Sequence, residues 1–185
     1  MKYSLVLILI FLFGCNHYET DISNDYKVIS DYINELLDEG KDLPMDSLYI
    51  CDSTKYYLEF ARYIKSSKTL KDSVPWDLVK NFIETNKSRF KYDHKFYLKL
   101  PYRLITYYEI DMLQEADIDS KLFQNWVRAG GVKYFSRVGY NDDHNEAIFY
   151  YSAYAGPLSG IGSIVYMEKR RNNWSIKKSI FLWIS

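Results

Sequence analysis

Residues 134–185 read YFSRVGYNDDHNEAIFYYSAYAGPLSGIGSIVYMEKRRNNWSIKKSIFLWIS and contain the densest β-strand signal in the chain. Residues 146–154 are almost entirely apolar or aromatic, which predicts a central strand covered on both faces. The polar stretches 141–145 and 170–173 are typical of exposed turns. We therefore expect an antiparallel β-meander whose last strand has apolar residues at alternate positions: Trp174, Ile176, Ile180, Leu182 and Ile184.

The connection at 155–162, AGPLSGIG, has a different composition from the strands around it. Glycine suits backbone positions with positive φ, and Pro157 fixes its own φ, so both residue types disfavour a regular strand. We predict a specialised loop that contains Gly156, Gly160 and Gly162.

The combination of FSRVGYN at 135–141, an apolar strand, the glycine-rich stretch, Trp174 and a final LWIS resembles a family of uncharacterised lipoproteins and secreted proteins of Bacteroidetes-type bacteria. The similarity covers the C-terminal part of the chain and, more weakly, 47–54 and 79–86. Family members often carry cysteines around the glycine-rich stretch, where this chain has Ala155 and Ser159. The resemblance implies a fold and a cell-envelope location, but no activity and no disulfide in this loop.

The N-terminus has the pattern of a bacterial secretory signal. Lys2 precedes an apolar core that is too short to span a bilayer stably. The end of this segment, Leu-Phe-Gly-Cys at 12–15, resembles a lipobox, in which the cysteine receives a diacylglycerol. We predict a signal peptide at 1–14, a lipid-anchored tether at 15–24 with acyl chains on Cys15, and one domain at 25–185. An ordinary signal peptide or an anchor helix is the alternative.

The chain is neutral overall, with 24 basic and 24 acidic residues, and removal of 1–14 takes away only one charged residue, Lys2. The chain therefore has no strong electrostatic field that would favour binding to nucleic acid or to an anionic membrane surface. We expect no nucleic-acid partner. Membrane attachment would depend on the acyl chains of Cys15, on the periplasmic or cell-surface side of the envelope.

Besides Cys15 the chain has one cysteine, Cys51, so an internal disulfide cannot stabilise the exported domain. The strand-like surroundings of Cys51 favour a small buried side chain. A catalytic thiol would need a nearby base, and the histidines fall in the tether and in polar turns: His17, His94 and His144.

Helices are predicted mainly in the first two thirds of the chain. Residues 25–39 place apolar side chains at spacings of three and four, and Gly40 suits the helix end. Further helices are expected at 55–70, from Pro75 onward with Trp76 in the apolar stripe, and at 123–129 with Trp126 pointing inward. Strands are expected at 48–51 and 96–106. We predict an α+β domain whose helices pack on an antiparallel sheet formed mainly by the C-terminal third. A cone-shaped sheet wrapped on a helix is an alternative architecture, based on analogy alone.

A run of carboxylates follows the strand at 96–106, but it lacks the spacing and the internal glycine of a calcium loop. We interpret it as a solvated, partly helical connection and predict no metal or cofactor: Glu109, Asp111, Glu115, Asp117 and Asp119.

The chain contains 19 tyrosines, and Tyr150, Tyr151 and Tyr154 cluster before the glycine-rich stretch. Tyrosine suits half-buried sheet faces and also interaction surfaces. These residues are therefore either core or, with Gly156, Gly160 and Gly162, a binding face for an envelope protein, a peptide or a glycan.

Two classes of function remain open. The first is a non-enzymatic, lipid-anchored binding protein of the envelope. The second is an envelope hydrolase that uses Ser159 or the turn containing Asp142, Asp143 and His144. We favour the first, because Gly-Pro-Leu-Ser-Gly at 156–160 lacks the spacing of a nucleophile elbow and the turn resembles a hairpin tip.

Overall fold

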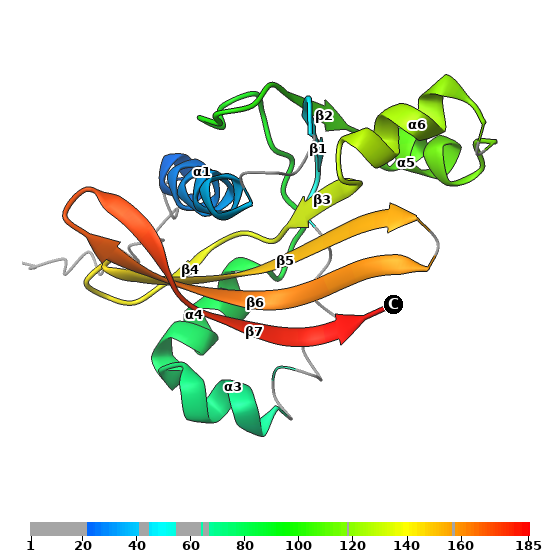
Figure 1. The fold of residues 1–185 in the computed structure, drawn as a ribbon. Helices are drawn as coiled ribbons and strands as arrows, with labels where there is room; N and C mark the ends of the chain where they lie inside the picture. The colour runs from blue at the N-terminus through cyan, green and yellow to red at the C-terminus, as the bar shows by residue number, and fades with distance from the viewer. Residues whose placement is uncertain (1–21, 41–44, 55–63, 65–66, 118, 157) are drawn as a thin grey trace, which may run out of the picture.

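The computed structural model describes residues 22–40, 45–54, 64, 67–117, 119–156 and 158–185. One sheet has the strand order β2-β1-β3-β5-β6-β7, with β4 paired to β5 (Figure 1). The helices are α1 (Ile22–Glu39), α3 (Lys68–Ser73), α4 (Trp76–Thr85), α5 (Tyr107–Gln114) and α6 (Lys121–Arg128). The strands are β1 (Leu48–Cys51), β2 (Tyr102–Ile105), β3 (Val132–Phe135), β4 (Gly139–Tyr140), β5 (Glu146–Gly156), β6 (Ser159–Arg170) and β7 (Asn173–Ile184).

The C-terminal strands form the predicted antiparallel meander. β3 pairs with β5, β5 with β6 and β6 with β7, all antiparallel. The predicted α+β class, with its helices in the N-terminal part, is confirmed. The sheet is nevertheless mixed, because β1 runs parallel to both β2 and β3. Parallel neighbouring strands need a crossover connection, and helices lie in the connection from β1 to β2 and in the connection from β1 to β3.

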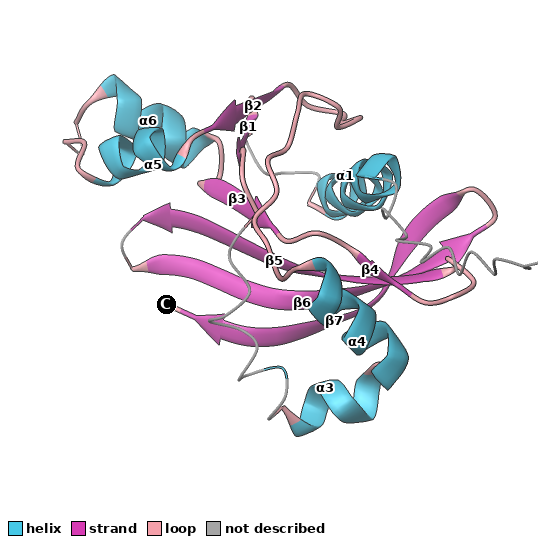
Figure 2. Ribbon diagram, turned by 180° about the vertical axis from the view of Figure 1, so that it is seen from behind, coloured by secondary structure: helices cyan, strands magenta, loops and turns pink. Residues whose placement is uncertain are grey.

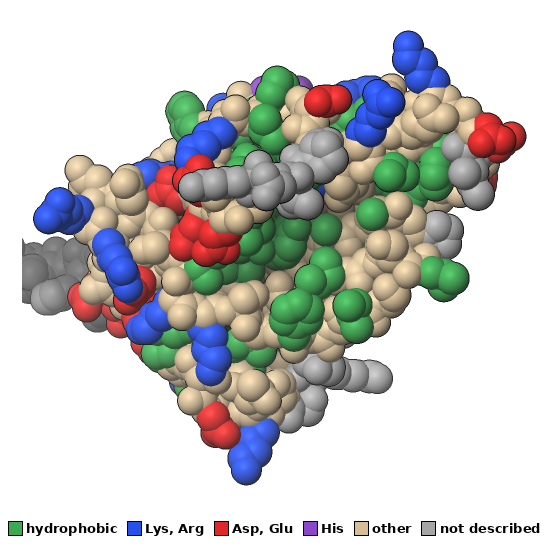
Figure 3. Space-filling view, in the orientation of Figure 1, with side chains coloured by type: hydrophobic (Ala, Val, Ile, Leu, Met, Phe, Trp, Pro, Cys, Tyr) green, Lys and Arg blue, Asp and Glu red, His purple; other side chains and the backbone are tan. Residues whose placement is uncertain are grey.

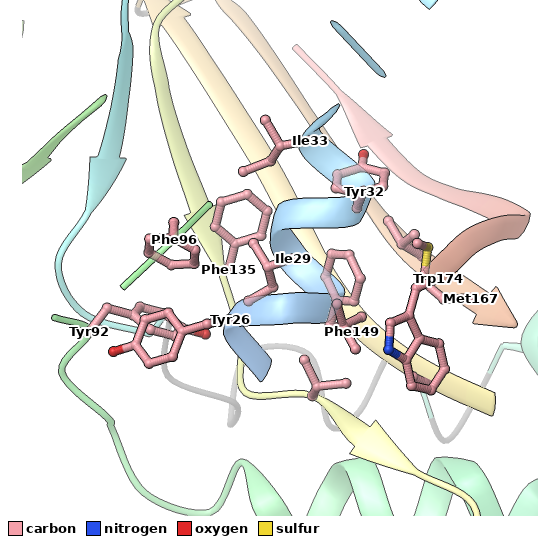
Figure 4. Close-up of a cluster of buried hydrophobic side chains, with 14 of the residues drawn as sticks. Tyr26, Ile29, Tyr32, Ile33, Tyr92, Phe96, Phe135, Phe149, Met167 and Trp174 are labelled. Atoms are coloured by element: carbon pink, nitrogen blue, oxygen red, sulfur yellow. The ribbon is translucent and has the colours of Figure 1, made fainter. Parts of the chain in front are cut away.

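Helices cover both faces of the sheet. α1 lies on one face, and α3 and α4 lie on the other (Figures 1 and 2). Successive residues of a strand point to opposite faces, so Phe149 of β5 packs under α1 while Ile148 and Tyr150 pack with the core around α4. Figure 4 shows the predicted apolar face of α1 over the aromatic side chains of the sheet.

The polar face of α1 protects part of the edge strand β7. The carboxylates of Asp31 and Glu35 accept hydrogen bonds from the backbone N–H groups of Trp174 (2.8 Å) and Ile176 (2.9 Å). Exposed strand edges carry unpaired backbone groups that can recruit other strands. α1 therefore covers a face of the sheet and also satisfies two donors at its edge.

The prediction of a loop at 155–162 is wrong. β5 continues to Gly156 and β6 begins at Ser159, so most of this stretch is strand. Among the described residues, positive φ occurs at Gly130 and Gly131 and at two non-glycine residues, and at none of the glycines of this stretch. A β carbon at Gly162 would lie 2.2 Å from the Trp183 ring nitrogen, and one at Gly160 would lie 3.1 Å from the same ring. The glycines are needed because the Trp183 indole lies against β6.

Several smaller expectations changed. The strand predicted at 96–106 is limited to β2, and Trp76 of α4, expected in the apolar stripe, is 43% exposed. α1 begins at Ile22, within the segment predicted as tether. Trp126 of α6 is buried as predicted.

The signal peptide, Cys15 and most of the helix predicted at 55–70 lie outside the described residues. No helix in the described part is long and apolar enough to cross a membrane.

The FSRVGYN segment joins β3 to β4 and attaches them to α1. The Asp25 carboxylate, fully buried in the first turn of α1, accepts hydrogen bonds from Arg137 Nε (2.5 Å), Val138 N (3.2 Å) and the Tyr140 hydroxyl (3.1 Å). At Gly139, between Val138 and Tyr140, a β carbon would lie 2.5 Å from the Phe82 Cα of α4. This short segment thus holds helices on both faces of the sheet.

We expect Asp25→Asn to lower the free energy of unfolding by about 3–5 kcal/mol, because it leaves the Arg137 guanidinium partly buried without a counter-charge. The control is Asp38→Asn on the same helix, whose pair with Lys99 is exposed and should contribute about 0–1 kcal/mol. Urea unfolding followed by circular dichroism measures both. Equal losses in the two variants would contradict the anchoring role of Asp25.

Gly162→Ala should destabilise the protein by about 1–3 kcal/mol, because its methyl group would overlap the Trp183 ring. Gly156→Ala is the matched control, since a β carbon there meets no atom within 4 Å. Thermal unfolding of the two variants checks the prediction. A Gly162→Ala variant as stable as Gly156→Ala would show that the indole position does not require glycine.

Candidate ligand-binding groove

The predicted tyrosine cluster does not form one surface. Tyr150 is 1% exposed and its hydroxyl accepts a hydrogen bond from the Trp183 indole (3.2 Å). Tyr151 points to the opposite face, where its ring packs with Tyr32 and Phe135. Tyr154 is half-buried against Trp183 on the Tyr150 side of β5. Of the three, Tyr151 lines the largest groove described below.

The glycines of the predicted binding face have packing roles or open surroundings. Gly160 and Gly162 lie beneath Trp183, whereas nothing lies within 4 Å of a β carbon at Gly156. The structure therefore gives Gly160 and Gly162 a steric role in Trp183 packing and gives Gly156 no such role.

The residues of the hydrolase alternative lie apart. Ser159 is exposed at the β5–β6 hairpin, and Asp142, Asp143 and His144 lie in the β4–β5 turn. β5 separates the two turns by about 30 Å, at ~3.3 Å per residue. Among the described residues, no titratable side chain lines the shallow pocket that contains Ser159. His144 stacks on Tyr140 at 5.2 Å between ring centroids. Neither location combines a nucleophile with a base.

Cys51 is fully buried in β1, and burial raises the pKa of its thiol to about 11. A protonated, inaccessible thiol is a poor nucleophile, which agrees with the predicted packing role. The acidic run lies on α5 and the turn after it, where Glu109 accepts from the Thr106 N–H as part of a capping box. Within the described residues, no group of three or more His, Cys, Asp or Glu could hold a metal ion.

The principal opening lies on the α1 face, between the end of α1, the sheet and the C-terminus of α6. It has a volume of about 590 Å³ and adjoins a smaller apolar pocket beneath α1. Figure 3 shows hydrophobic side chains lining a hollow on this face. We call this opening the groove and define it by Met45, Asp46, Val127, Arg128, Gly130, Lys133 and Tyr151.

Lys133 is the chemically distinctive residue of the groove. Its ammonium group donates hydrogen bonds to the carbonyl oxygens of Ala129, Gly130 (2.9 Å) and Gly131 (3.2 Å). The positive φ angles of Gly130 and Gly131 turn the chain after α6, so that these carbonyls converge on one point. A cation at a helix C-terminus is favourable. Part of the role of Lys133 is therefore to cap α6.

The charge of Lys133 has no carboxylate partner among the described residues. The residue is 8% exposed, and burial lowers the pKa of its side chain to about 8. Arg128, exposed on the rim, likewise forms no ion pair in this part of the chain. The described lining of the groove thus combines apolar walls with two cations, Lys133 and Arg128, and one carboxylate, Asp46.

One feature of the sequence points to Lys133. Lys133 is the second residue of the stretch VKYF, which directly follows Gly130-Gly131, and all residues of this strand are buried. A charged residue at an inward position of a covered strand needs a partner or a function. The alternation of apolar and polar residues along the strands gave no reason to assign Lys133 a binding role.

Comparison with protein-family models, curated proteins and solved structures finds no match to this chain.

The buried Lys133 should make stability depend on pH. Its pKa is about 8 in the folded chain and 10.5 when unfolded, so the unfolded state binds more protons between these values. Stability should therefore rise with pH from about 8 to 10.5, by about 1–3 kcal/mol, as the cost of burying the charge is relieved. Urea unfolding of wild type and Lys133→Met across this range isolates the effect. A constant difference between the two proteins would contradict it.

Proposed function

We propose that the protein is a lipid-anchored, non-enzymatic binding protein of the bacterial cell envelope, and that its groove takes an amphipathic ligand with an anionic group. The observation that carries the ligand class is the buried Lys133 beside an apolar wall, without a carboxylate partner among the described residues. The membrane anchor rests on the lipobox-like sequence that ends at Cys15.

Apolar side chains from α1 and β1 give the ligand a place for its hydrocarbon part. The pocket next to Lys133 is lined by Ile33, Leu36, Leu37, Met45, Leu48 and Ile50. Burial of apolar ligand surface supplies most of the affinity in such sites, and a few polar groups orient the ligand.

The cations orient the anionic end. All three N–H donors of Lys133 already have carbonyl partners, so this residue would act through its charge. Arg128 on the rim can supply direct hydrogen bonds to a carboxylate or phosphate oxygen. A neutral ligand of the same shape gains neither interaction.

The test uses the full chain in its bacterial membrane and a diazirine-bearing hexadecanoic acid as photoreactive probe. We expect labelling of peptides that contain Met45, Val127 or Tyr151, and weaker labelling by the matching alcohol. Val127→Glu should lower groove labelling about tenfold, because it places a carboxylate in the apolar wall and repels the anion.

Leu122→Glu is the matched control, because Leu122 lies on the same helix, is similarly exposed (44% against 48% for Val127) and lies outside the groove. Cys15→Ala should move the chain from the membrane to the soluble fraction, since acyl chains supply the attachment. Equal labelling by acid and alcohol, or equal loss in both helix variants, would contradict the ligand assignment. Retention of Cys15→Ala in the membrane would contradict the anchor.

A further inference from the structure

The sheet has a second edge, β2, and no described side chain accepts a hydrogen bond from its outward backbone N–H groups, as Asp31 and Glu35 do at the start of β7. The carbonyls of Pro101 and Ile105 accept hydrogen bonds from Leu48 N (2.9 Å) and Asp52 N (2.8 Å) on the β1 side. Backbone groups alternate in direction along a strand, so those of Tyr102 and Leu104 point away from β1. No strand in the described part of the chain pairs with β2 on that side.

A cleft of about 220 Å³ lies beside this edge, between β2 and the helical pair α5–α6. Its walls include side chains that are unusually exposed for their size: Tyr108 (73%), Met112 (48%) and Leu122 (44%). Clustered apolar exposure of this kind marks interaction sites. The cleft shares no residue with the groove.

The charge around the cleft is negative. Asp111 and Glu115 follow Tyr108 and Met112 by three residues, so they lie on the same exposed face of α5 or at its end. Asp117 and Asp119 extend the acidic surface into the next turn. Of the cations near the cleft, Arg103 is neutralised by its ion pair with Glu109, and the exposed Lys121 next to Leu122 offsets one of the four other carboxylates.

We propose that this edge and cleft bind an extended peptide segment that pairs with β2, inserts one large apolar side chain into the cleft and carries basic residues beside it. The unpaired backbone groups of Tyr102 and Leu104 select an extended chain. The apolar walls select the anchor side chain, and the carboxylates of α5 select the flanking charge. This is a second binding site, independent of the groove.

The test measures fluorescence anisotropy of a labelled peptide with the full chain in detergent micelles. The peptide has about ten residues: alternating threonine and valine, one central phenylalanine and two lysines at each end. We expect saturable binding that Leu122→Glu weakens about tenfold and Val127→Glu leaves unchanged. These are the same variants as for the groove, with their roles exchanged, so failure of one site is distinguishable from failure of the other.

Two peptide variants test the mode of binding without changing the protein. N-methylation of the backbone amides on one edge removes the strand-pairing donors and should reduce affinity at least about tenfold. Glutamate in place of the terminal lysines should weaken binding, with a difference that shrinks as salt rises. The proposal is overturned if the N-methylated peptide binds as tightly as its parent, or if no peptide binds. It is also overturned if sedimentation shows a dimer of the chain that Leu122→Glu dissociates, because a second copy would then occupy this edge.

Discussion

The ion pair between Asp25 and Arg137 is the constraint on which the arrangement of layers depends. Burial raises the pKa of Asp25, while the Arg137 guanidinium acts in the opposite direction. The carboxylate also accepts from Val138 N and the Tyr140 hydroxyl, so it fixes the backbone between β3 and β4 at the start of α1. Asn86, at the end of α4, binds the peptide groups of Arg137 from the other side (2.8 and 3.0 Å). One irregular segment therefore locks the helix of one face, the helix of the other face and the sheet between them. A buried charge is costly without a partner, so loss of either Asp25 or Arg137 alone would disturb all three layers.

The sequence predicted what depends on local periodicity. Spacings of three and four identified α1, alternation identified the C-terminal strands, and Trp126 was correctly placed inward. It could not predict what depends on distant partners. The glycines at 160 and 162 suggested a loop because their steric role depends on Trp183, which lies across a strand pairing. The hydrogen bonds of Asp31 and Glu35 were not predictable, because their partners, Trp174 N and Ile176 N, are far along the chain. The parallel pairing of β1 was likewise not visible, since nothing local distinguishes it from a hairpin strand.

The residues of the candidate site were likewise predictable only where they do not depend on distant contacts. Tyr151 was named from composition and does line the groove, but adjacent residues of a strand face opposite ways, so Tyr150 could not join it. Lys133 was missed because its meaning depends on the turn at Gly130 and Gly131, which gathers three carbonyls around the ammonium group. The groove itself arises where α1 ends, while the sheet face beneath it continues past Ile50 and Tyr151. A helix that covers only part of a sheet face leaves an apolar floor, and this fold places a cation at its border.

The two edge strands of the sheet, β2 and β7, have different surroundings, and this difference bears on where a partner strand can bind. At the start of β7, a partner strand would have to displace the carboxylates of Asp31 and Glu35, which are held by the anchored helix α1. That displacement would leave charged groups without their donors. At β2, the outward backbone groups compete only with water, and the strand is too short to invite uncontrolled pairing. Its neighbour α5 begins with a capping box directly after the strand, which keeps the acidic helix close to the edge. The fold therefore protects the start of one edge and leaves a short edge beside an acidic helix accessible, so a binding partner at β2 is selected by charge and by one anchor side chain rather than by strand length.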